Sequence, residues 1–216
     1  MDKVSNVRVG PLPNDSPYMK PFRLYFKQNG KEKNWDLVKA HDSVAIITLN
    51  KTRNKLVVVK QFRPAVYYGQ ICDYLNSVGS EVDSEKVIEM FPPKNAITME
   101  LCAGIVDKDI SLVEIAREEL IEECGYDVPV NRIEEVIRFR SGVGTTGSLQ
   151  VMYYCEVTDD DKINGAGGGV DDELIDVHEL SIEEAKEMLK QGTEHTSPPG
   201  FLFGILWFLT NKAQNL

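Results

Sequence analysis

Acidic side chains are concentrated in residues 117–126, which read REELIEECGY. Glu119, Glu122 and Glu123 stand at i, i+3 and i+4, so a helix would carry all three on one face. Like charges at this spacing repel one another. Three carboxylates together also form a set of hard oxygen ligands, which Mg²⁺ prefers, and Mg²⁺ keeps water positions that phosphate oxygens can take. The pattern predicts a divalent-cation site, with a solvated acidic face as the alternative.

The residues before the acids predict how they are positioned. The segment 97–104, ITMELCAG, has the character of a strand, and a short loop separates it from the segment 111–125. Ser111 followed three residues later by Glu114 is a capping box, which marks a helix start. Gly125 follows the last helical residue, where a left-handed C-cap is expected. A strand, a loop and a helix bearing acids together form a compact platform for metal and phosphate.

The remaining chain alternates strands and helices. The predicted strands are 22–26, 34–39, 43–50, 55–62, 133–141, 148–157 and 173–180, and the predicted helices are 181–190 and 199–211. Residues 68–96 read as an irregular excursion with one short helix near 84–91, and the glycine-rich run 164–169 as a mobile loop. This order predicts an α/β fold with a mixed sheet, not a doubly wound fold. We expect a β-rich arm over 1–42 and a main domain over 43–216.

Composition narrows the function classes. The chain has 216 residues, of which 42% are hydrophobic, and a formal net charge of −10. This charge argues against a nucleic-acid partner, because phosphate backbones select basic surfaces. The longest apolar run, 201–209, is about half the length of a membrane span, so no membrane partner is expected. Four cysteines without metal-ligand spacing, and an N-terminus without an apolar signal segment, predict free thiols in a cytoplasmic protein.

The segment 104–126 resembles the Nudix box, the signature of the Nudix hydrolase family. In that box a glycine is followed by a glutamate and then by Arg-Glu-aliphatic-any-Glu-Glu-any-Gly-aliphatic. Glu119, Glu122, Glu123 and Gly125 match it, and Tyr126 takes the final apolar place. Two positions depart: Ile110 stands for the first glutamate and Glu118 for the arginine. In the family these two residues form a salt bridge that braces the loop against the helix. Arg117 lies one position early, roughly 100° around the helix, and is not an obvious replacement.

Further stretches are similar to the branch of the family that cleaves nucleoside-diphosphate sugars: WDLVKAHDSVAIITL, VVVKQFRPAVY, MELCAG and SGVGTTGS. The resemblance implies an α/β/α sandwich with a mixed sheet, preceded by an N-terminal β-rich subdomain. It implies hydrolysis of UDP-glucose and other UDP-sugars to UMP and a sugar 1-phosphate, with Mg²⁺ as the cofactor and Mn²⁺ as an alternative. It also implies a homodimer in which both chains build each active site.

The resemblance further implies the roles of individual residues. The metal is held by the Ala103 carbonyl oxygen and by Glu119, Glu122 and Glu123, and these three acids and Glu173 are catalytic, with Asp171 and Asp172 as alternatives to Glu173 for the base. Trp35 stacks on the nucleobase, Arg63 reaches the phosphates, and Arg140, or alternatively Arg138, completes a phosphate clamp. The alternatives without a functional role are a core position for Trp35, a surface ion pair for Arg63 and a solvated acid for Glu173.

Two rival functions stay open on the sequence. The first is the same hydrolysis with ADP-ribose as the substrate. It would differ only in the pockets for the base and the distal sugar, whose shapes cannot be derived from the sequence. A non-catalytic nucleotide-sugar binding module is motivated by the two departures at Ile110 and Glu118. The histidines, His41, His178 and His195, are expected to be structural, and Cys102 and Cys124 to be packing residues.

Overall fold

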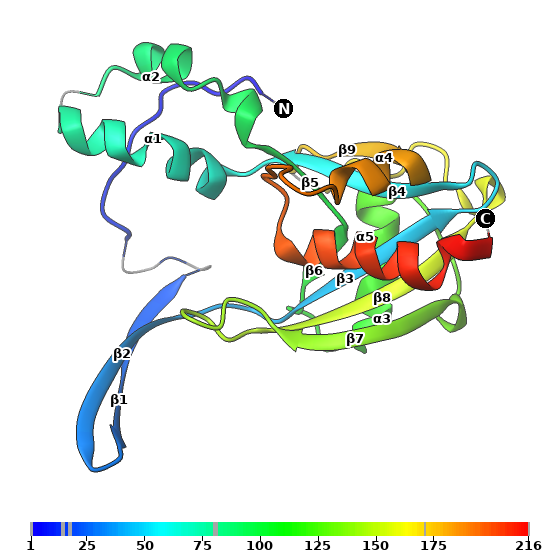
Figure 1. The fold of residues 1–216 in the computed structure, drawn as a ribbon, viewed down its shortest axis with the longest axis horizontal. Coiled ribbons are helices and arrows are strands. Elements are labelled where there is room, and N and C mark those ends of the chain that lie inside the picture. The colour runs from blue at the N-terminus through cyan, green and yellow to red at the C-terminus, as the bar shows by residue number, and fades with distance from the viewer. Residues whose placement is uncertain (1, 14–15, 17–18, 80–81, 171, 216) are drawn as a thin grey trace.

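A computed structural model describes residues 2–13, 16, 19–79, 82–170 and 172–215 (Figure 1). The strands are β1 (Lys20–Gln28), β2 (Lys31–Lys39), β3 (Ser43–Asn50), β4 (Lys55–Phe62), β5 (Ile97–Glu100), β6 (Cys102–Ile105), β7 (Ile133–Arg140), β8 (Leu149–Val157) and β9 (Asp176–Ser181). The α-helices are α1 (Pro64–Val78), α2 (Ser84–Met90), α3 (Leu112–Glu119), α4 (Ile182–Met188) and α5 (Pro199–Asn211). A π-helical turn, η2 (Leu120–Cys124), continues α3, and short 3₁₀ turns are η1 (Pro93–Ala96), η3 (Val130–Arg132), η4 (Asp159–Asp161) and η5 (Ala213–Asn215).

The first two strands form a sheet of their own. β1 and β2 pair antiparallel from Lys20↔Lys39 to Gln28↔Lys31, and the turn between them is Asn29-Gly30. Both turn residues have positive φ, 52° and 77°, which an Asn-Gly turn provides at low strain. Figure 1 shows this hairpin projecting from the body as an arm.

The body is built on a mixed sheet of seven strands. The order along the sheet is β5-β4-β3-β8-β7, with β6 paired to β3 and β9 paired to β4. β3 and β8 run parallel, while the other pairs are antiparallel. β3 is buried at every position after Ser43, which fits a strand covered on both faces.

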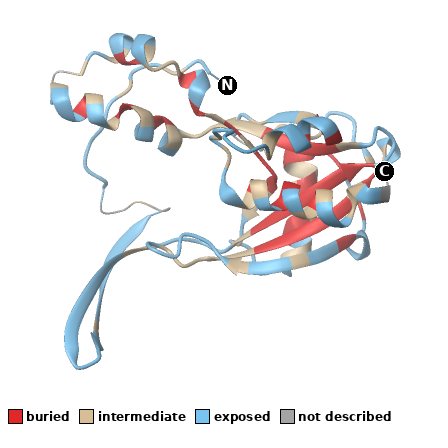
Figure 2. Cartoon of the chain, viewed as in Figure 1, coloured by how far each residue is buried: buried red, intermediate tan, exposed pale blue. Residues whose placement is uncertain are grey.

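Alternation along the central strands divides the core into two layers. Val44 and Ile46 pack with Ile115 and Leu120 of the α3–η2 helix on one face. Ala45 and Ile47 pack with α5 on the other face. The residues coloured as buried lie mostly along the strands of the sheet, with others on the helices (Figure 2). This arrangement is the mixed α/β sandwich expected from the sequence.

Residues 64–96 form a small helical lobe, where the sequence analysis was partly wrong. The short helix expected near 84–91 is confirmed as α2, but α1, with 15 residues, was read as irregular. Its apolar positions Tyr67, Ile71 and Leu75 recur every four residues and are buried within the lobe's own cluster. The turn formers that suggested a loop are exposed on the opposite side of α1. A narrow apolar stripe buried in a small lobe gives a weak helical pattern.

Several other boundaries follow the sequence closely. Ser111 and Ser181 each cap their helices with complete capping boxes. β9 begins three residues later than the expected strand 173–180, because Glu173 lies in a turn in which its N–H donates to the Val170 carbonyl oxygen. Among the described residues, no helix combines the length and the apolar character needed to cross a lipid bilayer.

Candidate active site

The acidic helix starts as an α-helix and ends as a π-helix. Its regular part, α3, stops at Glu119, and η2 carries Glu122 and Glu123. Gly125 then adopts φ 72°, and a Cβ there would overlap the carbonyl group of Ala166. Both the left-handed backbone and the close approach require glycine at this position. π-Helical turns of this kind occur often at functional sites.

The edge of β6 receives two of the three acids. The Glu123 carboxylate accepts a hydrogen bond from the Ala103 N–H at 2.9 Å, and Glu123 is only 4% exposed. A Cβ on Gly104 would overlap the carboxylate of Glu119. The absence of a side chain at Gly104 therefore lets Glu119 lie directly against the strand. Glu119 and Glu123 thus converge on Ala103-Gly104.

The electrostatics of this cluster oppose full ionisation. Burial, with the charges of Glu122 and Glu173, raises the pKa of Glu119 to about 7. Burial raises the pKa of Glu123 to about 8 against the effect of the Ala103 hydrogen bond, and the charges of Glu119 and Glu173 add to the rise. A positive charge placed next to these carboxylates would stabilise their ionised form.

The donor set fits a divalent cation. Carboxylate and carbonyl oxygens are the ligands that Mg²⁺ and Mn²⁺ take, and the raised pKa values show carboxylates that lack charge compensation. Among the described residues, however, no three His, Cys, Asp or Glu side chains already stand in a metal-binding cluster. The Glu122 carboxylate lies 3.9 Å from the Lys108 ammonium.

Lys108 also explains the two departures from the box. It lies in the loop between β6 and α3, and its ammonium is 2.5 Å from the Glu118 carboxylate. The loop-to-helix pair is therefore present with its charges exchanged, the cation on the loop and the anion on the helix. Arg117 turns away, to the Val128 carbonyl oxygen and to Asp127. Sequence spacing hid this pair, because Lys108 is two positions from Ile110.

Arg63 lies just after β4 and faces the acids. Both of its fork nitrogens donate to Glu100 at 2.6 Å, and Glu100 is 7% exposed. Thr98 donates its hydroxyl to the same carboxylate at 2.5 Å. The Glu100 hydrogen bonds raise the pKa of Arg63, and the charges of Glu123 and Glu173 act in the same direction. Glu100 was missed from sequence, although an acid inside the apolar strand 97–104 is a signal that could have found it.

Glu173 is brought to the site by the glycine-rich loop. Gly168 and Gly169 donate their N–H groups to the carbonyl oxygens of Glu123 and Glu122 at 2.8 and 3.0 Å. The loop expected to be mobile is thus tied to the end of η2. Glu173 is exposed, and its charge acts on both Glu119 and Glu123. Asp172 is also exposed, and Asp171 lies outside the described residues.

The substrate-binding candidates occupy the loop 141–147 and its surroundings. Trp35 is on β2, 56% exposed, and donates its indole N–H to the Gly144 carbonyl oxygen at 2.8 Å. It is therefore not a core tryptophan. Arg140 donates to the Gly147 carbonyl oxygen at 3.2 Å and lines a cavity. Arg138 is paired with Glu135 on the exposed side of β7, so Arg140 is the better placed of the two arginines.

The cavity measures about 360 Å³ and shares two wall residues with the acid site. Its wall includes Glu100 and Ala103, the residues that hold Arg63 and Glu123. The opposite walls are the segments 139–142 and 198–201. Clefts of this size hold small ligands. The cavity was not predicted from the sequence, since its walls come from five separate segments.

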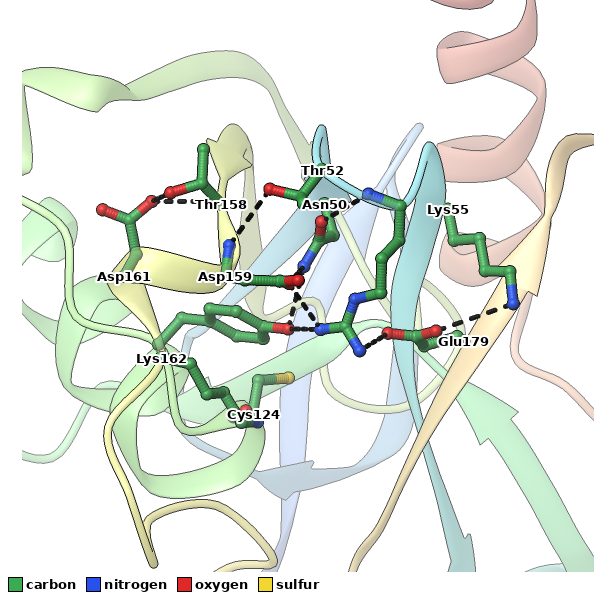
Figure 3. Close-up of polar contacts among 11 residues, drawn as sticks. Asn50, Thr52, Lys55, Cys124, Thr158, Asp159, Asp161, Lys162 and Glu179 are labelled. Atoms are coloured by element: carbon green, nitrogen blue, oxygen red, sulfur yellow. Dashed lines mark hydrogen bonds and ion pairs between the residues drawn. The ribbon is translucent and has the colours of Figure 1, made fainter.

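The end of the acidic helix is fixed by a polar network (Figure 3). Arg53 donates to the Tyr126 hydroxyl at 2.7 Å and pairs with Glu179 at 2.6 Å. Lys162 donates to the Cys124 carbonyl oxygen at 2.6 Å and lies 4.4 Å from the centre of the Tyr126 ring. These contacts satisfy a carbonyl group that the helix end leaves free. The network therefore anchors the end of the acidic helix.

The histidines and cysteines have no part in the cluster. His41 is exposed, His178 lies on β9 with its pKa lowered by burial, and His195 is within hydrogen-bond distance of the Met188 carbonyl oxygen, at 2.5 Å. Cys102 and Cys124 are fully buried beneath the acids as free thiols. Burial raises the pKa of Cys102 well above its usual range, so it packs as a neutral group.

Known proteins resemble the chain over its whole length. The chain is 39% identical over 222 residues to the uridine diphosphate glucose pyrophosphatase NUDT14 of Mus musculus, covering 100% of this chain and 99% of the relative. Identity to the protein of the same name from Bos taurus is 39% over 221 residues, with the same coverage. The GDP-mannose pyrophosphatase of Enterobacter sp. (strain 638) is 31% identical over 151 residues, 70% of this chain and 65% of the relative. No protein-family model matches the chain.

Proposed function

Because the chain belongs to the Nudix family of nucleotide-sugar pyrophosphatases, we propose that it hydrolyses the pyrophosphate bond of UDP-glucose and related UDP-sugars. The products are UMP and a sugar 1-phosphate. The observation that carries the proposal is the 39% identity to UDP-glucose pyrophosphatases over 100% of the chain. The acids of α3 and η2 that lie against β6 support it, because they form a site suited to an anionic substrate held through cations.

The cofactor proposed is Mg²⁺, with Mn²⁺ as the alternative of the same ligand preference. Glu119 and Glu123 would hold it, with Glu122 and the Ala103 carbonyl oxygen completing the set. When bound, such a cation offsets charge on the pyrophosphate and lowers the pKa of a bound water. The convergence of Glu119 and Glu123 on β6, with their raised pKa values, supports these ligands.

The protein's own groups bind the phosphates and move a proton. Arg63 uses its Nε and one Nη2 hydrogen on Glu100, and its other N–H groups, on Nη1 and Nη2, suit bidentate contact with phosphate. Glu100 and Thr98 hold this fork in place before substrate arrives. Glu173 is an exposed carboxylate near the helix acids, and we assign it the role of accepting a proton from the attacking water. Trp35 offers an exposed indole face for the base.

Product analysis by chromatography tests the proposal. Wild type is incubated with UDP-glucose or ADP-ribose, with Mg²⁺, Mn²⁺ or EDTA, beside Glu123→Gln and the exposed control Glu89→Gln. We expect UMP from UDP-glucose only with added metal, lost in Glu123→Gln and kept in Glu89→Gln. AMP from ADP-ribose as the main product would move the assignment to the rival substrate. Binding of UDP-glucose without turnover would identify a non-catalytic module.

We also propose that the protein works as a cytoplasmic homodimer, with residues 1–42 as the dimerisation arm of the Nudix domain 43–216. The arm is a two-stranded hairpin that exposes Phe22, Leu24 and Tyr25 at 49%, 49% and 73%. Isolated two-stranded hairpins are marginally stable in water, so this one needs a partner surface. A second copy covers it most simply, because closed twofold dimers are the commonest oligomers. The free buried thiols fit a reducing compartment.

Light scattering after size-exclusion chromatography tests the dimer. Wild type is expected at twice the chain mass, and Tyr25→Lys at the chain mass at low concentration, because the substitution places a charge at the most exposed of these three hairpin side chains. Tyr68→Lys, at a 48% exposed tyrosine of α1, is the matched control and should stay dimeric. A wild-type protein that is monomeric at high concentration would refute the arm's assignment.

A further inference from the structure

We infer that the 360 Å³ cavity beside the acids is the subsite for the glycosyl half of the nucleotide sugar. This assignment rests on the proposed function and names the group that fills a specific part of the site. Two wall residues belong also to the candidate active site. Glu100 holds the Arg63 fork, and the Ala103 N–H holds the Glu123 carboxylate. The cavity therefore borders the two residues that hold Arg63 and Glu123.

The cavity exists because small residues line it. Ala45 and Ala103, from the neighbouring strands β3 and β6, give it a shallow floor, and Gly200 opens the side formed by α5. Gly200 has no positive φ, so its backbone does not require glycine. A Cβ on Gly200 would lie 2.9 Å from the Gln150 amide oxygen and 3.8 Å from the Phe139 ring. The missing side chain keeps space open between the helix and the sheet.

The polar groups in the walls suit a ring that carries hydroxyls in several directions. Ser141 and Arg140 come from one wall and Gln150 from the floor. The Gln150 amide nitrogen donates to the Ser43 hydroxyl at 3.1 Å, and among the described residues no donor reaches its amide oxygen. Hydroxyl groups both donate and accept, so they can use such scattered partners. Pyrimidine bases, in contrast, present their polar groups in one plane.

Apolar surface in the cavity suits the carbon face of a hexose. Phe139, Pro199 and Phe201 supply this surface. The nucleobase is proposed to bind at a different position, on the exposed face of Trp35. The glycosyl half is therefore the part of the substrate that still lacks an assigned binding site. Specific pockets combine an apolar lining with few placed polar groups, as this one does.

Filling the cavity from Gly200 gives the test. Gly200→Leu places a side chain in the space, and Gly200→Ala adds one methyl group that also favours the helix. Gly69→Ala is the matched control, since Gly69 lies inside α1 with nothing within 4 Å of its Cβ position. Melting curves establish that each variant folds. Glucose 1-phosphate and UMP are then measured as inhibitors of UDP-glucose turnover.

We expect Gly200→Leu to weaken inhibition by glucose 1-phosphate at least about tenfold while UMP changes by less than about twofold, as steric exclusion from one subsite requires. Gly200→Ala should show a smaller loss in the same direction, and Gly69→Ala no change. Weakened UMP with unchanged glucose 1-phosphate would place the nucleoside in the cavity and overturn the inference. Unchanged constants for both products in folded Gly200→Leu would also overturn it. A wild type that does not cleave UDP-glucose would instead refute the proposed function.

Discussion

Metal-free protein should lose stability as the pH rises through neutrality, because of the buried carboxylates at β6. Burial raises the pKa of Glu123 to about 8, above the ordinary value of 4.5 that the unfolded chain has. Between these two values the folded state binds one more proton at Glu123 than the unfolded state does. The free energy of unfolding therefore falls with rising pH across this window and is highest below the unfolded pKa.

The size of the effect follows from the same values. One proton difference changes the free energy of unfolding by about 1.4 kcal/mol per pH unit. From about pH 5.5 to about pH 7.5, Glu123 alone accounts for about 3 kcal/mol, as an order of magnitude. Glu119, with its pKa raised to about 7, adds less, because it is only half-buried and water screens its charge. In a chain of this length the melting temperature should fall by about 6–12 °C.

Thermal melts in EDTA across this pH range measure the effect. Glu123→Gln should remove most of the slope and should melt above wild type at the upper end, while the exposed Glu89→Gln should follow wild type. Added Mg²⁺ should stabilise wild type more at high pH than at low pH, because it binds the ionised carboxylates, and should stabilise Glu123→Gln little. The comparison between the variants removes the general effect of the net charge. Equal slopes for wild type and Glu123→Gln would refute the reasoning.

Three further predictions concern the groups around the acids. Lys108→Glu should lower turnover by weakening the ion pair between the loop and the helix, and adding Glu118→Lys should restore turnover. A double-mutant cycle should give about 0.5 kcal/mol of coupling for this exposed pair. Glu100→Gln should lower kcat/KM about tenfold by loosening Arg63, with a smaller change in melting temperature than in kcat/KM. Trp35→Phe should raise KM by losing the hydrogen bond to loop 141–147, and Trp35→Ala should raise it further by losing the ring, as steady-state kinetics would show.

Local signals in the sequence predicted the elements with short-range causes. The capping box predicted at Ser111 is present in the structure, and the capping box at Ser181 and the Asn-Gly turn of the hairpin have equally local causes. α1 was missed because its apolar stripe packs only within a small lobe. The π-helical form of η2 was also not predicted. A change from i+4 to i+5 hydrogen bonding leaves no clear mark in the spacing of side chains.

Positions in the site were predicted where a motif fixes them and missed where tertiary pairing fixes them. Glu119 and Glu123 meet at β6 as the motif indicates. Glu100 reaches Arg63 only because β4 and β5 pair with Phe62 opposite Ile97 and Val59 opposite Glu100. Such a register is set by the whole sheet. The ion pair between Lys108 and Glu118 was missed for a similar reason. The conformation of the loop determines which of its side chains faces the helix, and the spacing of residues in the sequence does not show that conformation.

The glycine-rich loop links the two sources of acid in the site. The end of a helix leaves carbonyl groups without partners, and in η2 the carbonyl oxygens of Glu122 and Glu123 accept from Gly169 and Gly168. Both glycines have positive φ, 89° and 99°, which lets the chain turn back sharply toward Glu173. The same hydrogen bonds therefore complete the acidic helix and position the loop carboxylate. Movement of the loop away from the helix would break these hydrogen bonds and would leave the same two carbonyl groups without partners.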